Sequence, residues 1–155
     1  MRRTKPEKRN IEPDIRFNNV NIQVLIHHVL KKGKKSVATR VVYDALDIIE
    51  DKLKRDPVEV FELALKNVGP VMEVRPRRVG GATYQVPIEV DQHRKLALAI
   101  RWILNAARAR GGRSFAEKLS AELMEAADNQ GAAIRKKEET HKMAEANRAF
   151  SHFRF

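Results

Sequence analysis

Residues 72–90 lack the helical spacing that runs through the rest of the chain. In this segment apolar residues recur at every second position, at Met72, Val74, Tyr84, Val86, Ile88 and Val90. Gly80 and Gly81 lie between the two arms and can adopt the positive φ angles of a two-residue hairpin turn. Pro76 and Pro87 each remove one backbone donor, so neither arm can be the central strand of a larger sheet. The pattern predicts a two-stranded ribbon that projects from a helical body.

This ribbon is basic, with three arginines and no acid between Arg75 and Ile88. A lone two-stranded ribbon is only marginally stable in water, so we expect it to gain its order by lying against a polyanion. The alternative is an ordinary edge hairpin whose arginines keep the protein soluble and discourage strand pairing.

Helical spacing of apolar residues marks the other segments, and cap signals mark several of their starts. We expect helices over residues 20–30, from Ser36 to Leu53, from Asp56-Pro57 to Val68, from Asp91 to Gly111-Gly112, from Ser114 with Glu117 to Ala127, and over residues 132–148. The last helix has an apolar face reduced to Ile134, Met143 and Ala146, so we expect it to be thinly anchored and to protrude. The predicted fold class is mainly α: about six helices, with the basic hairpin protruding between the third and the fourth.

The length of 155 residues fits a single domain with one core, spanning residues 1–155. Residues 1–16 contain six basic and three acidic residues and two prolines, and they show no apolar stripe. This composition predicts an arm that is ordered only when it is bound to its partner. The predicted parts are an extended basic arm at 1–16, helices at 17–70, the hairpin at 71–90, helices at 91–148 and a C-terminal tail at 149–155.

Lysine and arginine number 31 against 20 acids, which gives a formal net charge of +11. The acids concentrate in residues 41–71, where seven acids accompany four bases, while basic clusters fall at helix ends and loops. These clusters comprise Arg2, Arg3, Lys5, Lys8 and Arg9; Lys31, Lys32, Lys34 and Lys35; Arg75, Arg77 and Arg78; Arg94, Arg101, Arg108, Arg110 and Arg113; and Lys136 and Lys137. Such a distribution predicts one composite face that binds nucleic acid.

RNA is the favoured partner, because the basic residues lie on loops, an arm and a ribbon rather than on one recognition helix. The charge leaves open the alternative of a sequence-independent DNA-binding or DNA-compacting protein. Competition between duplex DNA and structured RNA for the protein would distinguish the two functions.

No set of residues predicts catalysis, a metal site or a cofactor. The chain has no cysteine, and the neighbours His27 and His28 point about 100° apart on a helix, which suits core or interface histidines better than metal ligands. Gly80-Gly81 lacks the flanking residues of a phosphate-binding loop. No run approaches the roughly 18 apolar residues of a membrane span. We expect a soluble cytoplasmic protein that is not an enzyme and does not contact a membrane.

Several long motifs resemble the family of bacterial small-subunit ribosomal protein seven over essentially the whole chain. They are GPVMEVRPRRVGGATYQVP at 69–87, ALAIRW at 97–102, KKEETHKMAEANRAF at 136–150, the Gly33-Lys34-Lys35 turn and the closing HFRF. The resemblance implies a helical bundle with a protruding ribbon. It also implies a structural constituent of the ribosome, a primary binder of small-subunit ribosomal RNA that nucleates assembly of the head, the 3′ major domain. This protein would lie at the subunit interface near the decoding centre and the exit-site tRNA.

Site residues follow from the motifs and from the basic clusters. The resemblance implies ribosomal RNA contacts at Arg2, Arg3, Arg9, Lys34, Lys35, Arg75, Arg77, Arg78 and Arg94, and the clusters add Arg101, Arg110, Arg113, Lys136 and Lys137. The resemblance also places a set of residues near exit-site tRNA, namely Arg78, Gly80, Gly81, Tyr84 and Arg148. It directs Phe150, Phe153 and Phe155 toward ribosomal protein eleven of the small subunit, with protein nine as another neighbour.

Overall fold

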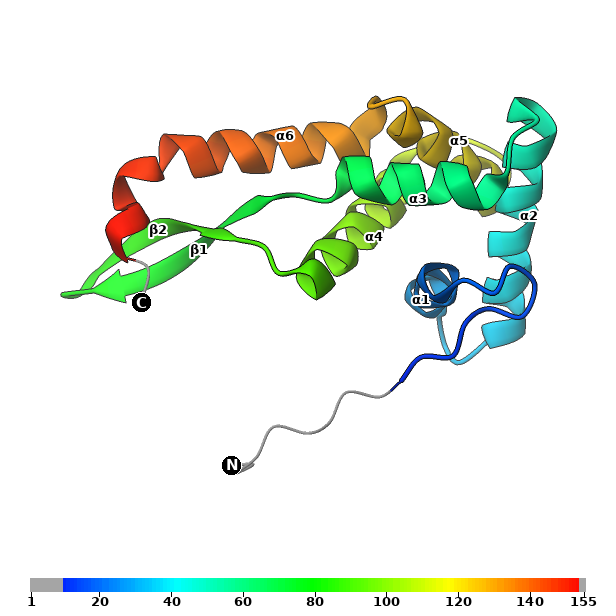
Figure 1. Ribbon diagram of the computed structural model, residues 1–155, viewed down its shortest axis with the longest axis horizontal. Coiled ribbons are helices and arrows are strands. Elements are labelled where there is room, and N and C mark those ends of the chain that lie inside the picture. Colours follow the sequence, from blue (N-terminus) through cyan, green and yellow to red (C-terminus); the bar gives the residue numbers. More distant parts are fainter. Residues whose placement is uncertain (1–9, 154–155) are drawn as a thin grey trace.

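The computed structural model describes residues 10–153, without the side chains of Val79 and Phe153. Within these residues, six α-helices and one two-stranded antiparallel sheet confirm the predicted fold class. The order is α1 Val20–Val29, α2 Lys35–Leu53, α3 Pro57–Val68, β1 Met72–Val79, β2 Ala82–Glu89, α4 Gln92–Ala109, α5 Phe115–Ala127, α6 Gly131–Ala146 and the 3-10 helix η1 Arg148–Phe153. Figure 1 shows the hairpin, the end of α6 and η1 extending together from the helical body.

Two of the predicted caps are present at the starts of α3 and α5. The Asp56 carboxylate accepts a hydrogen bond from the Val58 N–H at 2.9 Å, ahead of a first turn that contains proline. The Ser114 hydroxyl accepts from the Glu117 N–H at 3.2 Å. Each cap satisfies an amide that the helix leaves without an internal partner, so these boundaries depend on local sequence.

At two other predicted caps the structure shows no side-chain hydrogen bond to the helix. Helix α2 begins at Lys35, one residue before Ser36, and its cap position is held by Lys34 without a side-chain hydrogen bond. Asp91 occupies the cap position of α4 but makes no side-chain cap bond. Helix α1 has a cap that we did not predict, because the Asn19 side chain accepts from two amides of its first turn.

The core lies where α5 packs against α2, α3, α4 and α6. Trp102 is half-buried against this core. Val37 and Leu53 share the helical spacing of the apolar residues of α2, but they are exposed by 51% and 39%. The largest fully buried apolar side chains are Phe61, Ile22, Leu25, Ile26, Leu46, Ile49, Ile100, Ile103, Leu119, Leu123 and Val42.

The hairpin register follows from its two-residue turn, which pairs Val79 with Ala82 and Met72 with Glu89. Even-numbered residues of β1 therefore share a face with odd-numbered residues of β2. Met72 and Val74 of β1 therefore lie on the opposite face of the ribbon from Tyr84, Val86 and Ile88 of β2. Val86 is fully buried, so this part of the ribbon packs against its own chain. The order that a polyanion adds to the ribbon stays a prediction.

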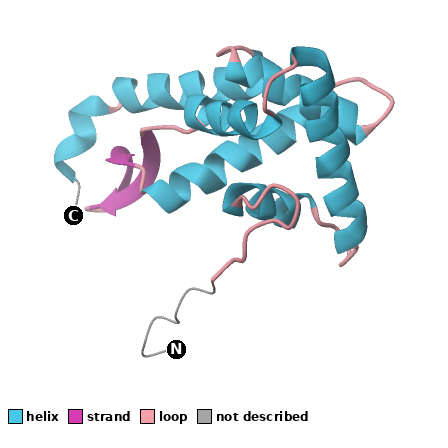
Figure 2. Cartoon of the chain, turned by 45° about the vertical axis from the view of Figure 1, so that its right-hand side comes forward, coloured by secondary structure: helices cyan, strands magenta, loops and turns pink. Residues whose placement is uncertain are grey.

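Helix α6 lies along the hairpin instead of protruding alone, as Figures 1 and 2 both show. Our expected apolar face of this helix was partly wrong, since Met143 is 50% exposed and Ala146 is exposed as well. Lys137 adds a polar anchor, because its Nζ donates to the Asn67 carbonyl at 2.7 Å. The residues of α6 that are buried are Ala133, Ile134, Thr140 and Ala144.

The described part of the N-terminal arm, residues 10–16, is attached to α2. Asp14 is 3% exposed and accepts a hydrogen bond from the Tyr43 hydroxyl at 2.7 Å, while Arg16 forms an ion pair with Asp47 at 2.7 Å. Burial and this hydrogen bond raise the pKa of Tyr43. The prediction that the arm is ordered only on its partner is therefore wrong for residues 10–16. The preceding part of the arm lies outside the described residues.

A buried ion-pair network joins α4, α5 and α6. Glu122, whose side chain is fully buried, accepts from Arg110 Nε at 2.6 Å and from the Ala133 N–H at 2.9 Å. Arg110 also forms an ion pair with Glu125. The hydrogen bond to Glu125 raises the pKa of Arg110 and lowers that of Glu125, because it favours the charged form of each group. This arginine holds the end of α4 against the other two helices.

We predict that Arg110→Ala destabilises the protein by about 3 kcal/mol, because Glu122 would keep a buried charge without its cation. Urea denaturation measures the free energy of unfolding. Arg108→Ala is the matched control, since Arg108 is exposed on the same helix and its loss is expected to change stability by less than about 0.5 kcal/mol. Equal decreases in stability in the two variants would contradict the structural role assigned to Arg110.

Candidate nucleic-acid interface

The arginines of the hairpin form the first basic group of the described chain. Arg75, Arg77 and Arg78 lie on β1 and all are exposed. Because side chains alternate along a strand, Arg75 and Arg77 point to one face and Arg78 to the other. The hairpin therefore presents positive charge on both of its faces.

Helix α4 carries a second row of arginines. Arg94, Arg101 and Arg108 recur every seven residues, which places them along one side of the helix, and all three are exposed. The helix follows directly after β2, so the row begins at the base of the hairpin (Figure 1). The hairpin and α4 thus form one continuous basic region of the chain.

A third basic group occupies the turn between α1 and α2. Lys34 and Lys35 are exposed there, next to Lys32 and Gly33, whose φ angles of 51° and 73° reverse the chain. Arg113 is exposed in the loop between α4 and α5. These positions match the sequence prediction that basic residues gather where the chain turns.

Glu73 joins two of the predicted RNA-binding arginines, and the sequence analysis missed it. This glutamate is 7% exposed at the base of β1. One of its oxygens accepts from Arg75 Nε at 2.6 Å, and the other accepts from Arg94 Nε and Nη2 at 3.2 Å each. The signal in the sequence was an acid two residues before Arg75, at the start of the first arm, whose other charged residues are all arginines.

Four other predicted contact residues have partners within the chain. Arg110 holds two carboxylates and Lys137 a backbone carbonyl, as described above. Lys136 pairs with Glu139 at 3.0 Å, and Arg148 pairs with Glu145 at 3.3 Å. Contact of these residues with RNA stays a prediction. The residues Arg2, Arg3, Arg9 and Phe155 lie outside the described part of the chain.

The hairpin and the C-terminal segment are joined by an aromatic contact. Gly80 and Gly81 form the exposed turn with φ angles of 58° and 91°. Tyr84, four residues past the start of this turn, lies with its ring 5.3 Å from that of Phe150 in η1. Residues predicted near tRNA and residues predicted to contact a neighbouring protein therefore lie side by side.

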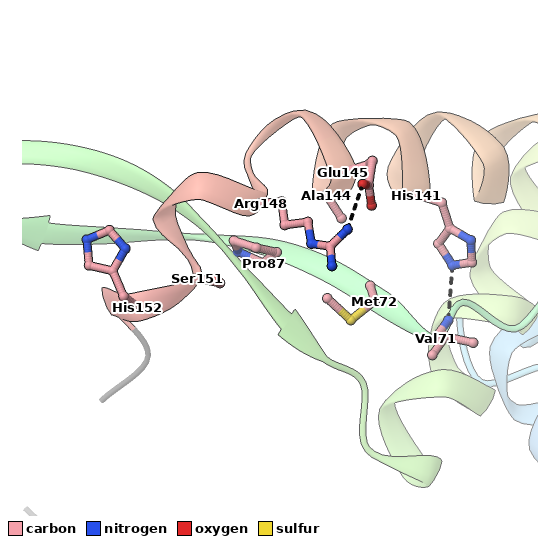
Figure 3. Close-up of a pocket in the computed structure, with 9 residues that line it drawn as sticks. All are labelled: Val71, Met72, Pro87, His141, Ala144, Glu145, Arg148, Ser151 and His152. Atoms are coloured by element: carbon pink, nitrogen blue, oxygen red, sulfur yellow. Dashed lines mark hydrogen bonds and ion pairs between the residues drawn. The ribbon is translucent and has the colours of Figure 1, made fainter.

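A cavity of about 690 Å³ lies between the start of the hairpin, the end of α6 and η1 (Figure 3). In it His141 Nε2 accepts a hydrogen bond from the Val71 N–H at 3.1 Å, which links α6 to the hairpin. Burial, followed by the charge of Lys137, lowers the pKa of His141. Figure 3 also shows the Arg148–Glu145 ion pair beside this cavity.

His27 and His28 are exposed near the end of α1, so they are not core histidines, and their place at an interface stays a prediction. His27 lies 2.9 Å from the Gln23 amide, and the His28 ring is hydrogen-bonded to the Val24 carbonyl. Between residues 10 and 153 no three histidine, aspartate or glutamate side chains are grouped so as to hold a metal ion. In the same range, no helix combines the length and apolar character needed to cross a bilayer.

Comparison with known proteins gives consistent matches along the chain. The family model described as "Ribosomal protein S7p/S5e" matches residues 1–148. A Thermotoga neapolitana protein named "Small ribosomal subunit protein uS7" is 58% identical over 155 residues, covering all of both chains. Proteins with the same name from Prochlorococcus marinus and Xanthobacter autotrophicus are 54% and 55% identical over 154 residues, covering 99% of each chain.

We predict that His141 makes the protein less stable as the pH falls from about 7.5 to about 5.5. Its folded-state pKa lies below the ordinary value of 6.5, so the unfolded chain binds the proton more readily and stability is lost on acidification. His141→Gln keeps an acceptor for the Val71 amide but does not titrate. Thermal unfolding at both pH values should show a smaller decrease in Tm for this variant than for the wild type.

The control for this measurement is His93→Gln, because His93 is exposed on α4. This variant should keep the wild-type decrease in Tm. An identical decrease in the His141 variant would show that the link between α6 and the hairpin does not respond to pH.

Proposed function

Since the chain belongs to the ribosomal protein S7p/S5e family, we propose that it is a structural constituent of the small ribosomal subunit. Membership of this family confirms the prediction from its motifs. In this role it binds ribosomal RNA of the head, the 3′ major domain, as a primary binder and nucleates assembly of that domain. It works in the cytoplasmic ribosome without catalysis. The match over residues 1–148 is the single observation that carries the proposal.

The distribution of charge supports RNA as the direct partner. The formal net charge is +11, and the exposed arginines and lysines of the hairpin, α4 and the α1–α2 turn can neutralise phosphates. Most contacts of a nucleic-acid-binding protein go to the sugar–phosphate backbone and set its position. The proposed RNA-contacting residues are Arg2, Arg3, Arg9, Lys34, Lys35, Arg75, Arg77, Arg78, Arg94, Arg101 and Arg113, with Arg110, Lys136 and Lys137 adding charge from internally paired positions.

The hairpin tip and the C-terminal segment serve further partners at the subunit interface, near the decoding centre. Arg78, Gly80, Gly81, Tyr84 and Arg148 approach exit-site tRNA. Their grouping is supported by the contact of Tyr84 with Phe150, which brings the hairpin and η1 together. The segment containing Phe150, Phe153 and Phe155 faces ribosomal protein eleven, with protein nine as a second neighbour.

We predict that Arg77→Ala combined with Arg78→Ala weakens binding to isolated head-domain RNA by about tenfold. The slope of log K against log salt should fall by about 0.7 to 0.9 for each phosphate that the variant no longer neutralises. A filter-binding titration at several salt concentrations measures both quantities, and duplex DNA competitor separates RNA recognition from general polyanion binding.

The control combines Lys52→Ala with Lys66→Ala, which removes the same charge from exposed positions in the acid-rich segment. This double variant should keep nearly the wild-type affinity. If both double variants bind equally weakly, net charge alone explains binding. If duplex DNA competes as well as RNA, the protein is a sequence-independent DNA-binding protein rather than a dedicated RNA binder.

We predict that shortening the hairpin impairs retention of exit-site tRNA but not assembly. Replacing residues 78–83 with Gly-Gly leaves the Arg77–Tyr84 pair as the closing pair of a new two-residue turn. Tyr84 can then keep its contact with Phe150. Purified small subunits should contain the shortened protein at normal stoichiometry and release exit-site tRNA faster. Normal tRNA release from such ribosomes would contradict the proposed role of the tip.

A further inference from the structure

Glu73 is an acid within the basic region, and it is buried and paired rather than solvated. It is 7% exposed, although an ionised carboxylate strongly prefers water unless it is paired. Its two oxygens are divided between two arginines on different elements, Arg75 on β1 and Arg94 on α4. The carboxylate therefore joins the base of the hairpin to the first turn of α4.

This arrangement leaves several donors of both arginines available. A guanidinium has five N–H groups in a fixed fork. Arg75 uses Nε and Nη2 toward one oxygen of Glu73, and Arg94 uses the same two nitrogens toward the other. Nη1 of each arginine has no hydrogen bond to the described residues, so its two N–H groups remain for a ligand. The arginine side chains are half-exposed, at 50% and 44%, so solvent and ligands reach them.

The sum of charges favours an anion at this site. Two arginines and one glutamate leave a net charge of +1, concentrated on groups whose orientation the carboxylate fixes. Arginine is suited to phosphate because its fork matches two phosphate oxygens. A side chain already held in its binding rotamer loses less conformational entropy when the ligand arrives.

We propose that Glu73 is a positioning residue, which holds Arg75 and Arg94 as a two-arginine site for one backbone phosphate group of the RNA. This inference rests on the proposed function, because RNA supplies the phosphate. It predicts that removing the carboxylate of Glu73 lowers the affinity of the protein for RNA, which is a polyanion. Ordinary charge attraction gives the opposite sign, since removing a negative charge from a phosphate-binding surface should raise affinity.

The experiment compares wild type, Glu73→Gln and Glu89→Gln in titrations with head-domain RNA. Glu89 lies on the same hairpin, is exposed and has no ion pair among the described residues, so its variant removes the same charge without an arginine partner. Glu73→Gln should bind about tenfold more weakly, as expected when contacting residues are uncoupled. Glu89→Gln should bind as well as the wild type or slightly better. Unchanged or tighter binding by Glu73→Gln would overturn the inference.

A second comparison separates positioning from a general effect on the fold. Adding Glu73→Gln to a protein that already carries Arg75→Ala and Arg94→Ala should cause no further decrease in affinity, because nothing remains to be positioned. A further decrease of similar size would mean that Glu73 acts through the fold, and would overturn the inference. Glu73→Asp, which keeps the charge but shortens the side chain, should bind with intermediate affinity. It also provides a folded alternative if the glutamine variant is unstable.

A measurement without RNA checks the geometry itself. In the wild type the Arg75 and Arg94 Nε–H signals should be resolved by NMR and exchange slowly with water, and in Glu73→Gln they should exchange quickly. Fast exchange in both proteins would overturn the inference. If wild-type protein fails to bind head-domain RNA, the proposed function fails; if it binds and Glu73→Gln binds equally well, only the positioning role fails.

Discussion

The rest of the structure depends on the burial of α5 among four other helices. Leu119 and Leu123 are fully buried on this helix, and each such side chain contributes about 1.5 to 3 kcal/mol through the removal of apolar surface from water. Between them in sequence lies the fully buried Glu122, and a carboxylate at the core must be paired. Arg110 meets this condition from the end of α4, so packing of the core fixes where one of the basic residues must point.

The sequence predicted the features of this fold that depend on near neighbours in the chain. The hairpin was identified from alternation around Gly80-Gly81, and the caps at Asp56 and Ser114 from residues within three positions. Of the buried residues of α6 it predicted only Ile134, because the hairpin that lies along this helix is about 50 residues away in sequence. The Asp14–Tyr43 bond that attaches the arm to α2 was missed for the same reason, since it joins residues 29 positions apart.

For the candidate site, the sequence alone identified the charged residues but not which of them form ion pairs within the chain. Arg77, Arg94 and Arg110 looked equivalent as members of basic clusters. In the structure Arg110 is held by two carboxylates in the body of the protein, Arg94 shares one carboxylate, and Arg77 has no ion pair among residues 10–153. These differences arise from contacts across elements, and they separate arginines that stabilise the fold from arginines that are available to a ligand.

The register of the hairpin has a consequence for how this protein can change over evolution. Since each arm places its apolar side chains on a different face, inserting or deleting one residue in one arm would turn that arm over and expose Val86 or bury an arginine. Lengthening both arms together, by one residue each on either side of the turn, keeps every existing pair in place. The reach of the ribbon is therefore free to vary, but only in steps that add or remove a complete cross-strand pair.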